Sequence, residues 1–493
     1  MGKIKETKNK KYKRFIKEFG SDIFTYDDFN GKVVLNCQAC NLAVNPTQRS
    51  QMEQHVNTNK HKTNLERWNR NKQMTLTQMD HPKDEFHKEL LNWLVVNNIP
   101  VSKIDNKSFT EFLVKYINKP IPSRFTIGRQ LDNVFENTMN GIKEQLSDEN
   151  IWLSVDETTS SDGRCIANVI IGMLKSEENG KSFLVNSVDL DGGVNHSIIC
   201  TVVDDTIKII WNGNFKREKF LLLVTDAATY MVKAGKSLKS FYPKLVHITC
   251  MAHLINRISC FIRNHYELTD EFIAENKKIF SKCRSRIEKF KSIAPNVSLP
   301  PKPIVTRWST WLGAAFYYAK NFDIIETVIN TFDSNDAICI KKAKNHLKNP
   351  ELKGQLAYLL SNFQFVTEIQ TLIQAKNLML SNAIALIEDF ESKLNSVQGS
   401  FGEEVKVKFE NLIDKNNGFK ELKNINTILN GQRLQLNANF TPEQLASFKF
   451  APITSCDVER SFSKYKYLYN QRKHRYEFDN FAKTLIISCN FEN

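Results

Sequence analysis

The chain has 493 residues, of which 41% are apolar, so it is long and apolar enough to form three or four domains with substantial cores. This composition excludes a disordered or fibrous protein. The net charge of +14 and the isoelectric point near 9.1 favour an anionic partner, which could be nucleic acid or an acidic membrane surface.

No apolar run reaches the roughly 18 residues that a membrane-spanning helix needs, so we expect a soluble protein. Residues 1–17 are rich in Lys and lack the apolar stretch of a secretory signal, which makes a nuclear address the expectation. Ten cysteines scattered over a chain of this length are typical of reduced thiols in an intracellular compartment.

Positive charge is concentrated at the amino end. Residues 1–80 contain 15 Lys and Arg and 8 Asp and Glu, a net charge of +7 and half of the total. This region is therefore the expected electrostatic contact with a polyanion. The alternative is a solvated basic tail without a specific partner.

The same region contains four residues with the spacing of a zinc site, Cys37, Cys40, His55 and His61. Tetrahedral zinc accepts two thiolates from a tight turn and two imidazoles from one helix face, and C-x2-C with H-x5-H provides both. We expect a short strand at 32–36 and a helix at 48–55. The alternative is that these four side chains are near one another in sequence by chance.

A helical unit is expected after the candidate zinc site. Residues 86–100 carry Leu90, Leu91, Leu94 and Val95 at helical spacing, which predicts a helix with an apolar, packed face.

The next segment alternates strand and helix patterns. Apolar runs predict strands at 151–157, 165–175 and 182–190, with a hairpin turn signal at 160–163. A helix is predicted at 197–210, followed by a buried strand at 220–226 and another strand at 245–249. The expected order is therefore three strands, a helix, a strand and a helix.

Two of these strands end in aspartate, at Asp156 and Asp226. Open α/β sheets bind ligands at the end where their strands finish, so both carboxylates could share a metal ion. Strand alternation sends the neighbouring Glu157 to the opposite face, so we do not expect it to be a ligand. Both aspartates could instead be turn caps or solvated side chains.

Four further segments complete the pattern. Residues 312–450 are dominated by helical spacing, and Thr441 with Pro442 predicts a helix start. The other three segments are Cys250-Met-Ala-His253, Thr306-Arg-Trp-Ser-Thr-Trp311 and Ser455-Cys-Asp-Val-Glu-Arg-Ser-Phe-Ser463.

Taken in this order, these motifs resemble the hAT superfamily of DNA transposases. The stretch 24–71 resembles the BED-type zinc fingers of transposases and the finger of the CGG triplet repeat-binding protein, and that second similarity continues to Arg129. The stretch around Asp226, residues 225–229, matches the family at its second acid. The segment 455–463 resembles the start of the closing hAT signature.

The resemblance implies an α/β ribonuclease-H-like catalytic core interrupted by an all-α insertion, with an amino-terminal ββα zinc finger and a small helical DNA-binding domain. The implied divisions are a basic tail (1–20), a BED-like finger (21–75), a helical DNA-binding domain (76–145), the first part of the core (146–299), the insertion (300–450) and the closing helices (451–493).

The resemblance also implies roles for single residues. Glu459, on a helix packed against the sheet, completes an acidic triad with Asp156 and Asp226 that holds Mg²⁺ or Mn²⁺, while Asp457 lies two positions away and points elsewhere. Zn²⁺ is the expected ion of the finger. His253, Arg307, Trp308 and Arg460 are the expected DNA-contacting or base-stacking side chains.

Other roles for these residues remain open. Cys250 and His253 could suggest a zinc site or a Cys/His nucleophile, but they lack the further ligands or an orienting partner. Trp308 could be a core side chain beside a surface Arg307, and Trp311 could be the residue that stacks.

The implied function is that of a cut-and-paste transposase, which binds the terminal inverted repeats of a transposon and cleaves double-stranded DNA by two-metal-ion hydrolysis. The resemblance further implies that a hairpin forms on the flanking DNA and that the 3′ ends are transferred into target DNA. The alternatives are a domesticated DNA-binding regulator without catalysis and a ribonuclease or other nuclease on the same sheet. Pairing of two ends implies at least a dimer. Phe481, Leu485, Ile486 and Ile487 in the implied dimerisation region could equally be core residues of one subunit.

Overall fold

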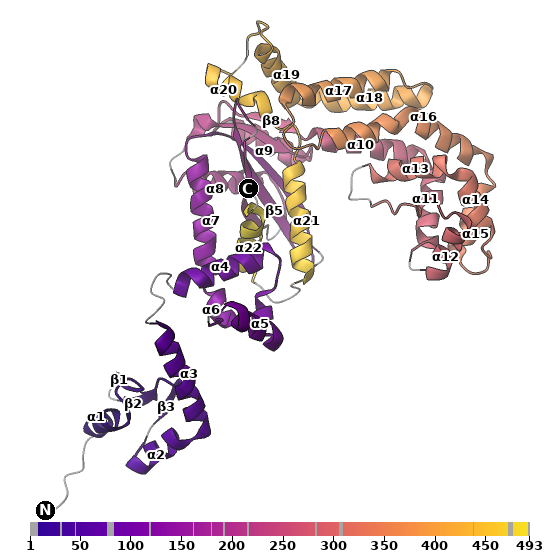
Figure 1. Cartoon of the computed structure of the whole chain (residues 1–493). Coiled ribbons are helices and arrows are strands. Elements are labelled where there is room, and N and C mark those ends of the chain that lie inside the picture. Colours follow the sequence, from indigo (N-terminus) through magenta and orange to yellow (C-terminus); the bar gives the residue numbers. More distant parts are fainter. Residues whose placement is uncertain are drawn as a thin grey trace, which may run out of the picture. The chain divides into compact units, whose positions relative to one another are not determined.

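A computed structural model describes most of the chain and divides it into two compact units, Met1–Glu89 and Leu90–Asn493, which are considered separately (Figure 1). The described residues are 8–29, 32–44, 46–75, 83–117, 120–160, 162–178, 180–190, 193–213, 216–281, 283–304, 309–436, 438–471 and 477–491.

The first unit is a small antiparallel sheet with helices. Its strands have the order β1-β2-β3, and its core includes Phe15, Phe24, Leu35 and Met52. The elements are α1 (Lys8–Phe19), β1 (Phe24–Phe29), β2 (Lys32–Cys37), β3 (Leu42–Val44), α2 (Arg49–Asn57) and α3 (Asn59–Thr75). The expected strand at 32–36 and the helix at 48–55 are confirmed, whereas α1 and β3 were not anticipated.

Short helices open the second unit. The apolar face predicted for 86–100 is confirmed, since Leu90, Leu91, Leu94 and Val95 are all buried. The elements are α4 (Lys83–Val96), which begins before the unit boundary, η1 (Val101–Asp105), α5 (Lys107–Ile117), α6 (Arg124–Gly128) and α7 (Leu131–Leu146).

A five-stranded mixed sheet follows, in the order β6-β5-β4-β7-β8. Strands β4, β5 and β6 are antiparallel neighbours, whereas β7 pairs in parallel with both β4 and β8. The elements are β4 (Asn150–Thr159), β5 (Cys165–Leu174), β6 (Ser182–Asp189), α8 (His196–Ile210), η2 (Arg217–Lys219), β7 (Phe220–Thr225), α9 (Thr229–Lys239) and β8 (Val246–Thr249). All the predicted strands of this sheet are confirmed to within two residues, and the central strands β4, β5 and β7 are mostly continuous runs of buried side chains.

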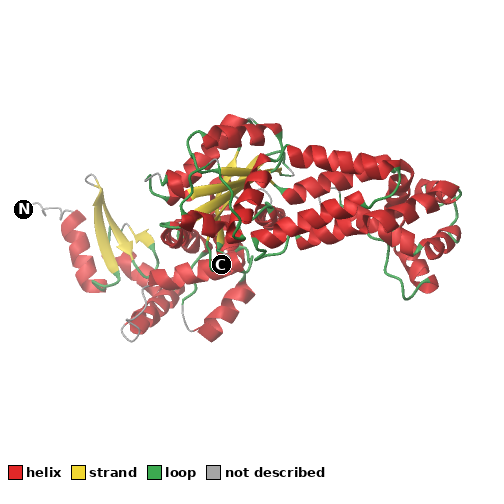
Figure 2. Cartoon of the chain, turned by 90° about the horizontal axis from the view of Figure 1, so that it is seen from above, coloured by secondary structure: helices red, strands yellow, loops and turns green. Residues whose placement is uncertain are grey.

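Helices cover both faces of this sheet (Figure 2). On β4, Glu157 receives a hydrogen bond from Tyr230 of α9, so α9 lies on the face to which Glu157 points. Asp156 points to the opposite face, where α21 (Cys456–Gln471) lies across β4, β5 and β6. The last helix, α22 (Phe478–Asn490), packs against β6 and α7.

Between β8 and α21 the chain forms a helical array that extends away from the sheet (Figures 1 and 2). It begins before the boundary expected at residue 300, since α11 packs against α13, α15 and α16. The elements are α10 (Met251–His265), α11 (Glu267–Ile279), α12 (Arg284–Ile293), α13 (Thr310–Lys320), α14 (Phe322–Asn330), α15 (Ile338–Leu347), α16 (Pro350–Leu372), α17 (Leu380–Asn395), α18 (Ser400–Asp414), α19 (Asn417–Leu429), α20 (Pro442–Ser447) and η3 (Phe448–Phe450). The last of these return to the sheet, where α19 packs against β8 and η3 against β5.

Two further expectations are decided by packing. Thr441 caps α20 through a hydrogen bond from Gln444 N, which confirms the predicted helix start. The four apolar side chains considered for dimerisation are buried within this chain, so they belong to its own core. Among the described residues, every helix is too short or too polar to cross a bilayer.

Candidate metal-binding sites

The sheet brings Asp156 and Asp226 to the same level. On the neighbouring parallel strands β4 and β7, Ser154 is paired with Val224. Two residues further along are Asp156, which lies within β4, and Asp226, which directly follows the end of β7, so both acids lie at the same level of adjacent strands. Neighbouring strands are about 4.8 Å apart, which places the two backbones within reach of one shared ion.

The third acid reaches this end of the sheet through the packing of α21. Asn168 of β5 donates a hydrogen bond to Ser461 of α21 over 2.8 Å, and both side chains are buried. The segment that leads into α21 is held to the start of α10, because Met251 N donates to Ile453 O over 3.0 Å and Ser455 N donates to Cys250 Sγ over 3.2 Å.

These contacts bring Asp156, His253 and Glu459 together. One ligand atom from each lies within 4.8 Å of the others. Nε2 of His253 is 3.4 Å from Oε1 of Glu459, and Nδ1 of His253 is 3.5 Å from Oγ of Ser455. Asp156 is only 7% exposed, whereas the Glu459 side chain is 37% exposed, so the cluster is open to solvent on the side of α21.

The electrostatics of this cluster favour a cation between the two acids. Burial and the charge of Glu459 raise the pKa of Asp156 well above its usual value. Burial alone would lower the pKa of His253, but Cys250, Glu459 and Asp156 together raise it to about 11. Burial opposes the charge of Glu459, yet its contact with His253 leaves its pKa below the usual value. The His253 imidazolium therefore partly neutralises a pair of carboxylates that repel each other.

Asp226 lies beside this cluster without joining it. Its Oδ1 accepts a hydrogen bond from Ala228 N over 3.0 Å, and its charge contributes to the raised pKa values of Asp156 and Glu157. The ligand set predicted from the sequence is Asp156, Asp226 and Glu459, which contains no histidine. The structure instead groups Asp156 and Glu459 with His253 at ligand distance.

Asp457 and Arg460, on either side of Glu459 in sequence, make a pair of their own. Arg460 Nη1 donates to Asp457 Oδ1 over 2.5 Å, and Arg460 Nη2 donates to the carbonyl of Gln374 over 2.8 Å. Ser182 donates to the other oxygen of Asp457 over 3.1 Å. Asp457 thus points away from Asp156, and Arg460 is held against the loop after α16.

Arg307 and Trp308 lie outside the described residues, so their expected DNA contacts stay predictions. Trp311, the other tryptophan of that motif, is 7% exposed and belongs to the core. Its indole Nε1 is buried without a hydrogen-bond partner among the described residues. Trp311 is therefore poorly placed for stacking on a base.

The second candidate site consists of Cys37, Cys40, His55 and His61, whose ligand atoms lie within 4.8 Å of one another. Nδ1 of His61 is 3.6 Å from Cys37 Sγ, 3.3 Å from Cys40 Sγ and 3.2 Å from His55 Nε2. Tetrahedral zinc with bonds of 2.0–2.3 Å separates its ligands by about 3.3–3.8 Å, so the donor atoms fit this ion.

The helix that carries the two histidines differs from the expectation. Both were expected on one helix face, but α2 ends at Asn57 and α3 begins at Asn59, so His55 and His61 come from two helices. At the break, Thr58 N and Thr58 Oγ1 both donate to the carbonyl of His55. Five intervening residues on a continuous helix would turn the two side chains apart, and the break allows both to face Cys37.

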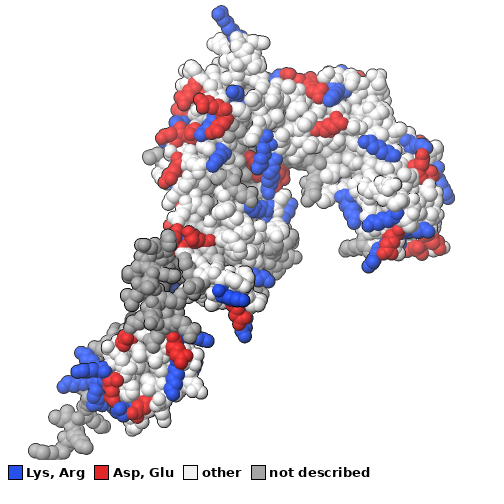
Figure 3. Space-filling view, viewed as in Figure 1, with Lys and Arg blue, Asp and Glu red and all other residues white. Residues whose placement is uncertain are grey.

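A second concentration of positive charge was not predicted from the sequence. Residues 277–348 contain 14 Lys and Arg and 5 Asp and Glu, a net charge of +9. Lys and Arg side chains, interspersed with a few acids, are visible at the far end of the helical array in Figure 3. A count of charge in windows along the whole chain would have found this region.

Residues 126–279 match the family model of a domain of unknown function (DUF659), a domain found in hAT-family transposase-like proteins. Comparison of the chain with curated proteins gives no match. The matched span includes Asp156, Asp226 and His253, whereas Glu459 and the four candidate zinc ligands lie outside it. The chain thus carries a DUF659 domain whose sheet holds two of the three candidate acids.

Proposed function

We propose that this protein is a cut-and-paste DNA transposase that cleaves the ends of a mobile element and joins them to target DNA. The observation that carries the proposal is the meeting of Asp156 and Glu459, more than 300 residues apart in sequence, at the end of the sheet where Asp226 also lies. A purely structural role would not require two mutually repelling carboxylates at a solvent-accessible sheet end.

The sheet supports a ribonuclease-H-like core. Its order, β6-β5-β4-β7-β8, has an antiparallel half and a parallel half that meet at β4, the strand of Asp156. A helical array separates this sheet from the helix of Glu459, in agreement with the interrupted core of the hAT superfamily.

The donor set supports a hard divalent cation, Mg²⁺ or Mn²⁺, because carboxylate oxygens suit these ions. Such ions would supply Lewis acidity to activate the attacking oxygen and stabilise the leaving oxygen of a phosphodiester. Asp156, Glu459 and Asp226 would hold them. His253 would release Glu459 for this task and remain at the site as a donor to a DNA phosphate.

Two regions support DNA as the partner. The first unit carries a Cys2His2 group, for which we propose Zn²⁺, within the basic stretch 1–80. The second is the basic stretch 277–348 of the helical array. Lys and Arg gain free energy on phosphates by releasing counterions, so both regions favour double-stranded DNA. A nuclear location and a homodimer or higher oligomer belong to the same proposal.

The proposal is tested by excision of a marker from a plasmid, with the marker placed between the DNA segments that flank the gene. The wild-type chain should excise the marker, and Asp156→Asn and Glu459→Gln should not. Asp205→Asn, which removes an exposed carboxylate on α8, serves as the control and should retain excision. Excision that persists in Asp156→Asn or Glu459→Gln would show that the acid assignment is wrong.

The rival functions give different results. A domesticated regulator would bind the flanking DNA specifically and show no cleavage at any Mg²⁺ concentration. A ribonuclease would degrade an RNA–DNA hybrid and leave the plasmid intact. The persistence of all the candidate acids favours an enzyme over a regulator.

A further inference from the structure

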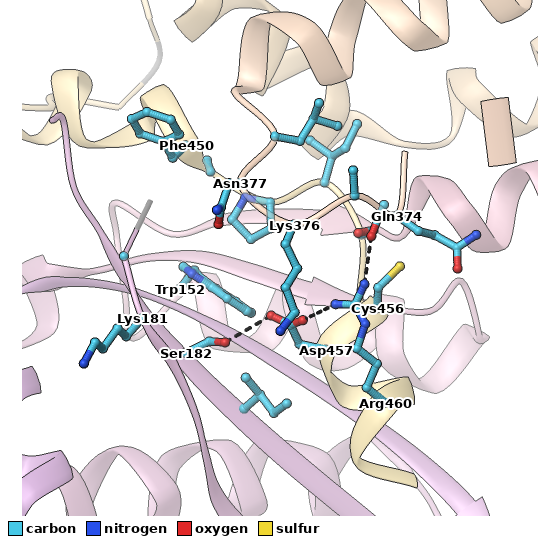
Figure 4. Close-up of a pocket in the computed structure, with 18 of the residues that line it drawn as sticks. Trp152, Lys181, Ser182, Gln374, Lys376, Asn377, Phe450, Cys456, Asp457 and Arg460 are labelled. Atoms are coloured by element: carbon cyan, nitrogen blue, oxygen red, sulfur yellow. Dashed lines mark hydrogen bonds and ion pairs between the residues drawn. The ribbon is translucent and has the colours of Figure 1, made fainter. Parts of the chain in front are cut away.

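A cavity of about 390 Å³ lies beside the start of α21 (Figure 4). One wall is the sheet, with Trp152 of β4 and Ser182 of β6. The second wall is the connection between α16 and α17, which contributes residues 373–378. The third is the segment from Phe450 into the first turns of α21. Its volume lies within the range of about 300–1,000 Å³ that is usual for small-molecule sites.

The cavity is strongly basic. Its lining includes four cations, Lys181, Lys376, Arg460 and Lys464, and one carboxylate, Asp457. Both oxygens of Asp457 are already engaged, by Arg460 and by Ser182. Lys464 donates to the carbonyl of Ser488. No side chain or backbone group among the described residues forms a hydrogen bond or ion pair with the ammonium groups of Lys181 and Lys376. The lining thus carries a net charge of +3, and in the part of the chain that the structure describes the two ammonium groups of Lys181 and Lys376 are unpaired.

The remaining lining is largely apolar and partly aromatic. Trp152, Ile170, Leu184, Ile373, Leu378 and Phe450 contribute to it. The indole of Trp152 lies over Gly172, where any Cβ would fall 2.3 Å from the ring. A ligand that fits this lining combines an anionic group, which pairs with the cations, with a flat apolar body, which packs against the apolar side chains.

The cavity is separate from the acid cluster but shares a helix with it. Trp152 precedes Asp156 by four residues on the same face of β4, which corresponds to about 13 Å along the strand. On α21, Asp457 and Arg460 belong to the cavity and Glu459 to the cluster. A ligand that draws Arg460 from Asp457 therefore acts on the turn of helix that carries Glu459.

We propose that this cavity binds a nucleoside phosphate. Its phosphate lies against Lys376 and Arg460, Lys181 adds positive charge at the opposite side of the cavity, and its base lies against the apolar wall near Trp152 and Phe450 (Figure 4). Guanidinium and ammonium groups bind phosphate by charge-assisted hydrogen bonds, and aromatic walls accept bases of any sequence. The nucleoside phosphate can be free in solution or the 5′-phosphorylated end of a DNA strand. Binding does not depend on cleavage at Asp156.

Calorimetric titration of the purified full chain tests the proposal. The probes are ATP, dAMP, inorganic pyrophosphate and a 5′-phosphorylated single-stranded tetranucleotide. A double variant, Lys181→Ala with Lys376→Ala, removes two exposed side chains and leaves the core intact. The matched control is Lys236→Ala with Lys415→Ala, two exposed lysines that do not line the cavity.

We expect one saturable site per chain for a mononucleotide or for the tetranucleotide. The probe that binds more tightly shows whether the ligand is a free nucleotide or the 5′-phosphorylated end of a DNA strand. The double lysine variant should weaken binding about 10-fold or more, in line with the loss of at least one charged hydrogen bond, and the control should change it less than 3-fold. Absence of saturable binding, equal weakening in the control, or pyrophosphate binding as tightly as ATP would each overturn the proposal.

The outcome is independent of the proposed function. Asp156→Asn should abolish excision and leave nucleotide binding unchanged. If the lysine variant loses nucleotide binding but keeps metal-dependent DNA cleavage, the proposed nucleotide site is supported. If the wild type excises the marker but binds no nucleotide, the proposed nucleotide site is wrong and the transposase proposal is unaffected.

Discussion

Asn168 of β5 and Ser461 of α21 share a buried hydrogen bond of 2.8 Å, and Ser461 lies two residues after Glu459. Asn168 also accepts a hydrogen bond from Ser187 of β6 over 2.8 Å, and Ser461 Oγ donates to the carbonyl of Val458. The position of Glu459 over Asp156 therefore depends on a chain of polar contacts that runs from the sheet into α21.

Removal of this contact should affect both stability and activity. Asn168→Ala leaves the Ser461 and Ser187 hydroxyls without their partner inside the core, which should cost about 1–3 kcal/mol in the free energy of unfolding. Urea denaturation measures this loss. Excision should fall further than the folded fraction does, because α21 is no longer fixed over β5.

The control for this variant is Asn186→Ala, which removes a hydrogen bond from β6 to Thr206 of α8 and does not involve α21. At equal folded fraction it should retain excision. Equal excision in the two variants would mean that the Asn168 contact does not position Glu459.

Removal of zinc should unfold the first unit. Its core is small, so the four ligands carry much of its stability. Cys40→Ser should release zinc, which atomic absorption detects, and should abolish the absorption bands of cobalt bound in its place. Cys260→Ser, at an exposed cysteine outside the group, should keep both. If zinc content is the same in the two variants, the Cys2His2 assignment is wrong.

Gly418 should be intolerant of a side chain. It is the second residue of α19, which packs against β8, and a Cβ there would fall 2.0 Å from the carbonyl oxygen of His247. A backbone atom cannot give way as a side chain can, so Gly418→Ala should destabilise by about 1–3 kcal/mol. Gly354→Ala, inside α16 with nothing within 4 Å, should be stabilising by about 0.5–1 kcal/mol. Thermal unfolding measures both changes. Similar shifts of the unfolding temperature in the two variants would contradict the close contact between Gly418 and the backbone of His247.

His247 should make stability depend on pH. Burial, with a contribution from Lys239, lowers its pKa to about 4, and its Nε2 lies 2.9 Å from Thr225 Oγ1. An unfolded chain protonates this imidazole near pH 6.5 and the folded chain does not, so the contribution is complete above about pH 6.5 and lost as pH falls toward 4.

The comparison of wild type with His247→Gln isolates this effect. The wild type should lose about 2 kcal/mol more than the variant between pH 7 and pH 4.5, measured by urea denaturation. His196→Gln, at the start of α8, is the control and should follow the wild type. Parallel curves for wild type and His247→Gln would exclude the imidazole as a source of the pH dependence.

The strands of the sheet were predictable because their signal is local. Each is a run of apolar residues that ends at a polar one, and both faces of the sheet are covered. Asp156 and Asp226 followed from the same pattern, since parallel strands finish at one end of a sheet. Glu459 was predictable only through a family resemblance, because no local pattern relates it to residues 300 positions earlier.

Other features could not be predicted because they depend on tertiary contacts. His253 meets Glu459 only because the start of α10 is bound to the segment before α21. The break between α2 and α3 falls at Thr58, whose Oγ1 accepts a hydrogen bond from His61 N over 3.1 Å and so caps α3. Thr is a favoured residue at a helix start, but this signal alone does not show that the helix must break between the two histidines. The basic cavity combines residues from three distant segments, each of which is ordinary alone.

We propose that Asp156, Asp226 and Glu459 form a metal-dependent centre for DNA cleavage. Single-turnover cleavage of the flanking DNA by purified protein, measured as a function of Mg²⁺ concentration, tests this proposal. We predict that cleavage requires the metal and falls about 100-fold or more in Asp156→Asn, Asp226→Asn and Glu459→Gln, but less than 3-fold in Asp205→Asn. Cleavage that continues without metal, or at the wild-type rate in any one of the three acid variants, would contradict the claim.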